Sequence, residues 1–187
     1  MKTSPLPRVR AVFALLLMFV TTRGWGIDPV AAPTVSAPVA PVAPPVAEKG
    51  YLKLGFEHLA SFTFVPPTAD ASADQNSTTA RVAEQIPATV KSWSGKKVLV
   101  VGFMIPVKME KGLVTEFLLM RNTMACCFGA TPSINEWVTV KMKKGVPPTM
   151  DVPVEFYGEL RVSPVFENGY LSGIYQLDGE RMGDVKG

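Results

Sequence analysis

Alternation of apolar and polar side chains is the strongest pattern in the chain, and it lies in the C-terminal half. Between residues 152 and 162 every second residue is apolar or glycine, while Glu155, Glu159 and Arg161 fall on the opposite face. A period of two residues is that of a β-strand with one buried face. Similar or continuous apolar runs complete a set of five predicted strands, at residues 98–107, 113–120, 137–142, 152–162 and 170–177.

Tight turns join two pairs of these strands. Lys111-Gly112 separates the first two, and Asn168-Gly169, a dipeptide typical of type I′ hairpins, separates the last two. Gly102 inside the first strand indicates a bulge or a sharp bend, as small closed barrels require. We therefore predict a mainly β domain at residues 96–180, a small five-stranded antiparallel OB-like barrel. An open sandwich is the competing architecture, because residues 143–151 are too proline-rich for the helix that most OB folds carry there.

Short helices are predicted to flank the barrel, in an N-terminal extension at residues 50–95. Pro87 suits the first position of one helix, which would end at Ser94-Gly95. Apolar residues at the start of the extension fit either a short helix or a strand: Leu54, Phe56, Leu59 and Phe62. Beyond the barrel, the polar tail at residues 180–187 is predicted to fray.

The first 49 residues have the composition of an export signal followed by a linker. Residues 11–20 are apolar without interruption, which at about ten residues is too short for a membrane span of roughly 20 but suits a signal-peptide core. We predict a signal peptide at residues 1–26, with an uncleaved membrane anchor as the alternative. Residues 27–49 are rich in proline, alanine and valine, and are predicted to form a semi-rigid polyproline-like linker. A ligand for a proline-recognition domain is the alternative for this segment.

The net charge argues against nucleic acid as a partner. The chain has a formal charge of +3, but residues 1–26 contain four basic residues and no acidic residue. Removing the signal peptide would therefore leave a mature protein with a charge of −1. A near-neutral protein lacks the basic surface that binds phosphate backbones. We expect a protein located in the periplasm or cell envelope, whose partner is an envelope protein or a small ligand.

Two adjacent cysteines, Cys126 and Cys127, are the main candidates for chemistry. Consecutive Cα atoms lie about 3.8 Å apart, below the roughly 4.4–6.8 Å usual for disulfide partners. A bridge between them would be strained and easily reduced, which fits thiol-redox chemistry rather than a structural crosslink. The thiolates could instead bind Cu or Zn together with Met124 and His58, the single histidine, and the soft sulfur ligands would favour Cu(I).

A purely structural interpretation of the same residues is also open. One thiol would be a small buried apolar group and the other would shape a tight loop, with the nearby methionines filling the core. His58 lies far in sequence from both cysteines, and no spacing indicates a nucleophile–base pair. We identify no catalytic residue.

Residues 86–142 resemble a family of bacterial domains of unknown function, the family numbered three thousand two hundred and ninety-nine. The matching pieces include Gly-Phe-Met-Ile-Pro at 102–106, Thr-Glu-Phe-Leu-Leu-Met at 115–120, and Cys126 followed nine residues later by Asn135. Family members often have Cys-x-His before a proline run and Asn-Gln. Here Phe128 replaces that histidine and Glu136 replaces the glutamine, which weakens a metal role. The resemblance implies an exported envelope protein without an assigned activity.

Taken together, these patterns predict an exported, non-catalytic module that binds a ligand or an envelope partner. The predicted binding region is the loop at residues 125–135, with Cys126, Cys127, Phe128 and Asn135 as its contact residues. The alternative is a metal-binding or thiol-redox accessory protein, linked to a transporter, that uses Cys126 and Cys127.

Overall fold

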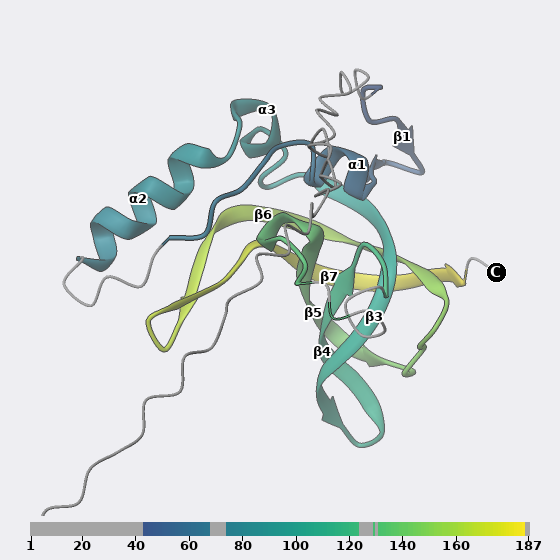
Figure 1. Cartoon of the computed structure of the whole chain (residues 1–187). Helices are drawn as coiled ribbons and strands as arrows, with labels where there is room; N and C mark the ends of the chain where they lie inside the picture. The colour runs from purple at the N-terminus through teal and green to yellow at the C-terminus, as the bar shows by residue number, and fades with distance from the viewer. Residues whose placement is uncertain (1–42, 68–73, 124–128, 130, 186–187) are drawn as a thin grey trace, which may run out of the picture. The chain divides into compact units, whose positions relative to one another are not determined.

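The computed structural model describes residues 43–67, 74–123, 129 and 131–185 of the 187-residue chain, and Figure 1 shows their arrangement. Within these residues the chain forms seven strands and four short helical segments. In chain order they are β1 (Ala47–Glu48), β2 (Tyr51–Leu54), α1 (Phe56–Leu59), α2 (Gln75–Gln85), α3 (Ala88–Lys91), β3 (Lys97–Glu110), β4 (Leu113–Met120), the 3-10 helix η1 (Ile134–Glu136), β5 (Trp137–Val146), β6 (Pro153–Glu167) and β7 (Tyr170–Val185).

The described strands form one sheet in the order β1-β2-β3-β4-β5-β7-β6, with an additional pairing between β3 and β6. The last five strands of the chain thus pair in a closed circuit, and β1 and β2 extend the sheet from β3. This arrangement confirms the predicted mainly β fold with short helices. The prediction of five strands in a purely antiparallel barrel is wrong, because the sheet has seven strands and the β2–β3 and β5–β7 pairings are parallel.

Both predicted hairpins are present, and their turn residues have the positive φ angles that such turns need: 52° at Lys111, 78° at Gly112, 53° at Asn168 and 85° at Gly169.

The parallel pairing of β5 with β7 follows from the partners of β6. The strand that follows β5 does not pair with it, because β6 pairs with β3 on one side and with β7 on the other. The open edge of β5 is therefore taken by β7, which runs parallel to it.

Gly102 allows two strands to approach closely rather than forming a bulge. The register shifts of β3 lie further along, between Pro106 and Lys108 and between Lys108 and Met109, so of the two alternatives predicted at Gly102, a bulge or a sharp bend, the bulge is wrong. A Cβ atom at residue 102 would stand 2.6 Å from the backbone oxygen of Met120. Only glycine fits this contact without a shift of backbone.

The polar end of the chain belongs to the sheet. Strand β7 continues to Val185, and Val185 and Met182 pair with Val154 and Phe156 of β6. The predicted fraying of this tail is therefore wrong for residues 180–185. Backbone pairing with a long neighbouring strand can order a segment whose side chains are polar, because the ladder hydrogen bonds do not depend on side-chain type.

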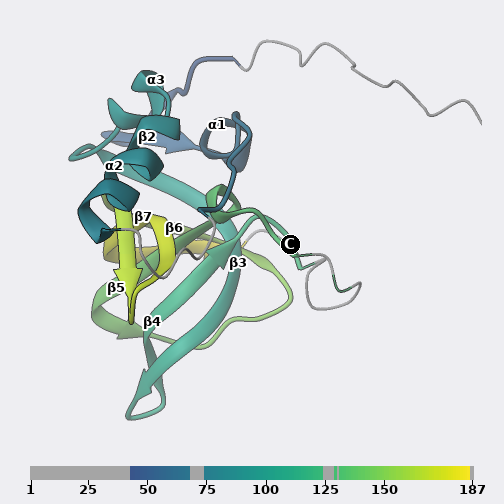
Figure 2. The same ribbon diagram turned by 60° about the vertical axis from the view of Figure 1, so that its left-hand side comes forward.

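One hydrophobic core unites the sheet with the helices. Figures 1 and 2 show the helices together at one end of the sheet, opposite the turn between β3 and β4. Side chains from the predicted N-terminal extension, such as Leu59, Val82 and Ile86, are buried with sheet residues such as Phe156. The hydroxyl of buried Tyr175 in β7 donates a hydrogen bond of 2.7 Å to the backbone oxygen of Leu59, which fixes α1 against the sheet.

Candidate functional site

The loop that contains the cysteine pair begins and ends in a network of short contacts. The structure does not describe Met124, Cys126, Cys127 or Phe128, so the predicted roles of these four residues lie outside the described residues. At the base of the loop, the guanidinium of Arg121 lies 3.0 Å from Glu136 Oε1. The backbone N–H of Arg121 also donates to the backbone oxygen of Glu136 at 3.0 Å. The other carboxylate oxygen, Oε2, accepts from the Ser133 N–H at 3.0 Å. The two ends of the loop are therefore fastened side by side.

Asn135, a predicted contact residue, lies inside the fold. Its side chain is only 2% exposed, and Nδ2 donates to the backbone oxygen of Phe62 at 2.7 Å. This bond joins the segment after α1 to η1 across 73 residues of sequence. The structure thus gives Asn135 a supporting role beneath the loop.

His58, a predicted metal ligand, has both ring nitrogens engaged by backbone groups. Nδ1 accepts from the Gly55 N–H at 3.2 Å, so the ring proton is assigned to Nε2, which donates to the backbone oxygen of Ala43 at 2.8 Å. A carboxylate oxygen of Glu57 lies 3.4 Å from Nδ1. In this conformation the imidazole joins α1 to the segment before β1, and neither nitrogen is directed to a metal.

A groove of about 540 Å³ lies beside His58 and the base of the loop. Strands β2 and β4 share one edge of β3, because β6 occupies the other edge along residues 97–103. The groove lies at Val101, between the end of β2 and the end of β4. Its lining residues are Ala43, Pro44, Pro45, Val46, Lys53, Leu54, Gly55, Phe56, Glu57, His58, Val101 and Arg121.

The groove combines an apolar lining with charged groups at its rim. Phe56 is buried, whereas Lys53 and Arg121 expose about half of their side chains (52% and 49%). Each cation already has a carboxylate neighbour: Glu48 lies 3.9 Å from Lys53 Nζ, and Glu136 holds Arg121. The carboxylate of Glu57, 64% exposed, stands at the same rim. The groove therefore carries both cationic and carboxylate groups around an apolar lining.

A second cavity of about 380 Å³ lies on the other side of the same segment. Its lining includes Trp93, which meets the His58 ring edge-on with 6.1 Å between the ring centroids. Ala43, Pro44, Pro45 and His58 line both cavities. Residues 43–45 therefore run between the two hollows rather than along the margin of one.

The sequence alone did not identify Lys53, Arg121 or Trp93 as site residues. A usable signal existed for Arg121, since it follows an apolar strand directly and opens the loop that ends at Glu136. No local signal marks Lys53 or Trp93, because their positions depend on how the N-terminal extension packs.

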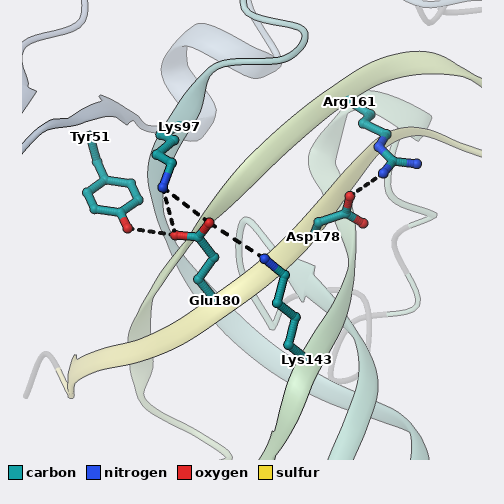
Figure 3. A network of polar contacts seen from close by, with 6 residues as sticks. All are labelled: Tyr51, Lys97, Lys143, Arg161, Asp178 and Glu180. Atoms are coloured by element: carbon teal, nitrogen blue, oxygen red, sulfur yellow. Dashed lines mark hydrogen bonds and ion pairs between the residues drawn. The ribbon is translucent and has the colours of Figure 1, made fainter.

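A separate polar network fastens β2 to other strands of the sheet (Figure 3). The Tyr51 hydroxyl donates to Glu180 Oε2 at 2.7 Å, and Lys97 Nζ lies 3.4 Å from Glu180 Oε1. Lys143 approaches the same carboxylate at 3.8 Å, and Arg161 pairs with Asp178 nearby. These contacts link β2, β3, β5 and β7 through one side chain, so we assign the network a structural role.

Glu180 is expected to make stability depend on pH in acid. The hydrogen bond from Tyr51, together with the contacts from Lys97 and Lys143, holds the pKa of Glu180 below its ordinary value. A carboxyl group whose pKa is lowered by folding stabilises the protein above its unfolded pKa of about 4.3, and this contribution is lost as the pH falls through the folded pKa. We expect Glu180→Gln to be less stable than the wild type at pH 7 and to lose less stability on acidification.

Urea unfolding of both proteins between pH 7 and pH 3 measures this difference. Glu84→Gln serves as the control, since Glu84 is an exposed carboxylate on α2. An equal acid dependence in the wild type and Glu180→Gln would contradict the role of the network.

Two further searches of the described residues gave negative results. No group of three or more His, Cys, Asp or Glu side chains in this part of the chain is arranged to hold a metal ion. Among the same residues, no helix has the length and apolar character needed to cross a membrane.

Comparisons with known proteins place the chain in a family. A search of curated proteins found no significant match. A crystal structure of a DUF3299 family protein from Pseudomonas aeruginosa PAO1 is similar, with 23% sequence identity and a TM-score of 0.48, covering 72% of this chain and 97% of that chain. Residues 52–183 match the family model described as "Protein of unknown function (DUF3299)", a wider range than the resemblance seen in the sequence. The chain belongs to the DUF3299 family.

Proposed function

We propose that this protein is an exported, non-catalytic binding module of the cell envelope, built on an OB-like barrel. Its binding site is the groove lined by β2, α1 and Arg121. The occupant is an extended segment of an envelope partner that carries a carboxylate. The signal-like residues 1–26 and the proline-rich residues 27–49 support export and attachment through a spacer.

The closed circuit of β3, β4, β5, β7 and β6 supports the OB-like description. Its strand order and the parallel β5–β7 pairing are compatible with a five-stranded Greek-key barrel. Strands β1 and β2 are then additions that form one wall of the groove. Because a fold does not determine a function, the binding proposal depends on the groove and not on the barrel.

The groove itself is the observation that carries this proposal. Its volume of about 540 Å³ falls in the range of ligand sites, roughly 300–1,000 Å³, and such sites combine apolar walls with a few placed polar groups. Lys53 and Arg121 supply the polar groups here. A guanidinium has five N–H donors, so Arg121 can hold Glu136 through Nη1 and bind a second carboxylate through other nitrogens.

Site-specific photocrosslinking in the producing cell tests the proposal. We expect a benzophenone amino acid placed at exposed Glu57, on the groove wall, to form a defined adduct with an envelope protein. Charge reversal by Lys53→Glu should lower the adduct yield about fivefold or more, the factor that corresponds to roughly 1 kcal/mol for a surface ion pair.

The control places the same crosslinker at Glu110, at the turn between β3 and β4, where no adduct of this kind is expected. Identical adducts from residues 57 and 110 would contradict binding in the groove. An adduct at residue 57 whose yield is unchanged by Lys53→Glu would contradict it as well. N-terminal sequencing of the protein from the same cells tests export, and a cytosolic product that keeps Met1 would contradict it.

A further inference from the structure

We propose that the groove and the second cavity together recognise an extended proline-containing segment followed by a carboxylate, and that residues 43–46 of this chain, which lie between the two, act as a built-in competitor. The inference rests on the proposed function, because it names the ligand chemistry and the regulation of the same groove. Residues 43–48 read Ala-Pro-Pro-Val-Ala-Glu. A partner segment must displace them to bind.

Backbone groups and one carboxylate hold this segment in place. The Ala43 oxygen accepts from His58 Nε2 at 2.8 Å, and the Val46 oxygen accepts from the Lys53 N–H at 2.8 Å. The carboxylate of Glu48 then lies 3.9 Å from Lys53 Nζ. Since the two hydrogen-bonded groups are backbone carbonyls, another extended segment with the same spacing could form the same contacts.

The two prolines give the segment its chemical character. Pro44 and Pro45 line both cavities, between the groove on one side and the hollow beside Trp93 on the other. Grooves lined by aromatic side chains bind proline-rich segments because the fixed φ of proline lowers the entropy lost on binding. Trp93 and His58, which meet edge-on, provide such an aromatic lining.

The segment is seated in a way that permits displacement. Ala43 and Pro44 are exposed, Pro45 is half-buried, and Val46 is 71% exposed. Residues 43–46 therefore cover little apolar surface, and beyond the pairing of Ala47 and Glu48 with β2 they are held by a few polar contacts that are each modest in water. A partner segment that also reaches Val101 and Arg121 could make more contacts than the resident one does.

The same chemistry is repeated earlier in the sequence. Two Ala-Pro-Val triplets, at residues 37–39 and 40–42, precede the Ala-Pro-Pro-Val at residues 43–46. A peptide copied from this region is therefore a rational probe for the groove, and it carries the carboxylate of Glu48.

Competition between the chain and this peptide tests the inference. The full-length mature protein and its Pro44→Gly/Pro45→Gly variant are titrated with a fluorescein-labelled peptide of residues 40–49, and binding is followed by anisotropy. Two glycines make the resident segment more flexible and so weaken its competition. We expect the variant to bind the peptide at least about tenfold more tightly than the wild type, because a tethered segment competes at an effective concentration on the order of 1 mM.

A peptide in which Pro44 and Pro45 are replaced by glycine is the matched control, and it should bind the variant at least about tenfold more weakly than the unchanged peptide. Equal binding of the proline peptide to wild type and variant would overturn the competitor role. The absence of binding to either protein at about 1 mM peptide would overturn the proline chemistry. Circular dichroism checks that the variant is folded; neither substitution site is fully buried.

The photocrosslinking and peptide-binding experiments test the two proposals independently. If the adduct at residue 57 depends on Lys53 but no peptide binds, the groove remains a partner site and only the proline ligand is refuted. Peptide binding without an adduct would retain the recognition chemistry and refute an envelope partner that is bound in the cell.

Discussion

Replacing Phe156 with alanine is expected to lower the free energy of unfolding by about 3–5 kcal/mol, the usual cost of truncating a buried phenylalanine. Phe156 is fully buried and lies 4.6 Å from Phe117, measured between ring centroids. It sits on β6, which pairs with both β3 and β7 where the circuit of strands closes. A cavity at this point removes contacts from both halves of the sheet. Urea unfolding followed by circular dichroism measures the loss.

Tyr170→Ala is the control for this experiment. Tyr170 is also an aromatic residue on a long strand, but it is 73% exposed at the hairpin turn. Its truncation should change the stability by no more than about 0.5 kcal/mol. A cost below about 1 kcal/mol for Phe156→Ala would contradict a core centred on the closed circuit of strands.

The strands themselves could be predicted because their signals are local. Alternation at residues 152–162 identified β6, and the Asn168-Gly169 dipeptide identified its turn to β7. The ends of the strands were harder to predict from sequence, since residues 180–185 are ordered by pairing with β6 and not by their own side chains. Local patterns report which face of a strand is buried but do not name its neighbour.

The pairing of distant segments could not be predicted from such patterns. The parallel contact of β5 with β7 depends on where β6 lies, and three residues of β2, at 52–54, pair in parallel with β3 across more than forty residues. Tyr51 and Glu180 show the same limit, because their hydrogen bond joins residues separated by 129 positions. Only the closed fold brings these groups together.

The candidate site shows this limit most clearly. Sequence reasoning selected His58 by residue type and Asn135 through the family resemblance, and the structure gives both a backbone partner: Ala43 for His58 and Phe62 for Asn135. The groove is built from residues 43–46, 53–58, 101 and 121, which no sequence spacing connects. A polar residue can be found by its type, but its role depends on a partner that the fold supplies.

Asn135→Ala is expected to lower the free energy of unfolding by about 1–3 kcal/mol, because it leaves the part-buried backbone oxygen of Phe62 without its donor. The amide is 2% exposed, so water cannot replace it without a rearrangement. Thermal and urea unfolding measure this loss. Asn76→Ala, the same substitution at an exposed position of α2, should change stability by no more than about 0.5 kcal/mol.

Binding of the residue 40–49 peptide separates a supporting role of Asn135 from direct contact. Placed in the Pro44→Gly/Pro45→Gly background, Asn135→Ala should leave the affinity for the peptide within about twofold under conditions where the protein is folded, because the amide is turned toward Phe62 and does not line the groove. A fall in affinity of about tenfold, which equals roughly 1.4 kcal/mol, would show that Asn135 acts in binding beyond its effect on stability. Unchanged stability would contradict the buried hydrogen bond itself.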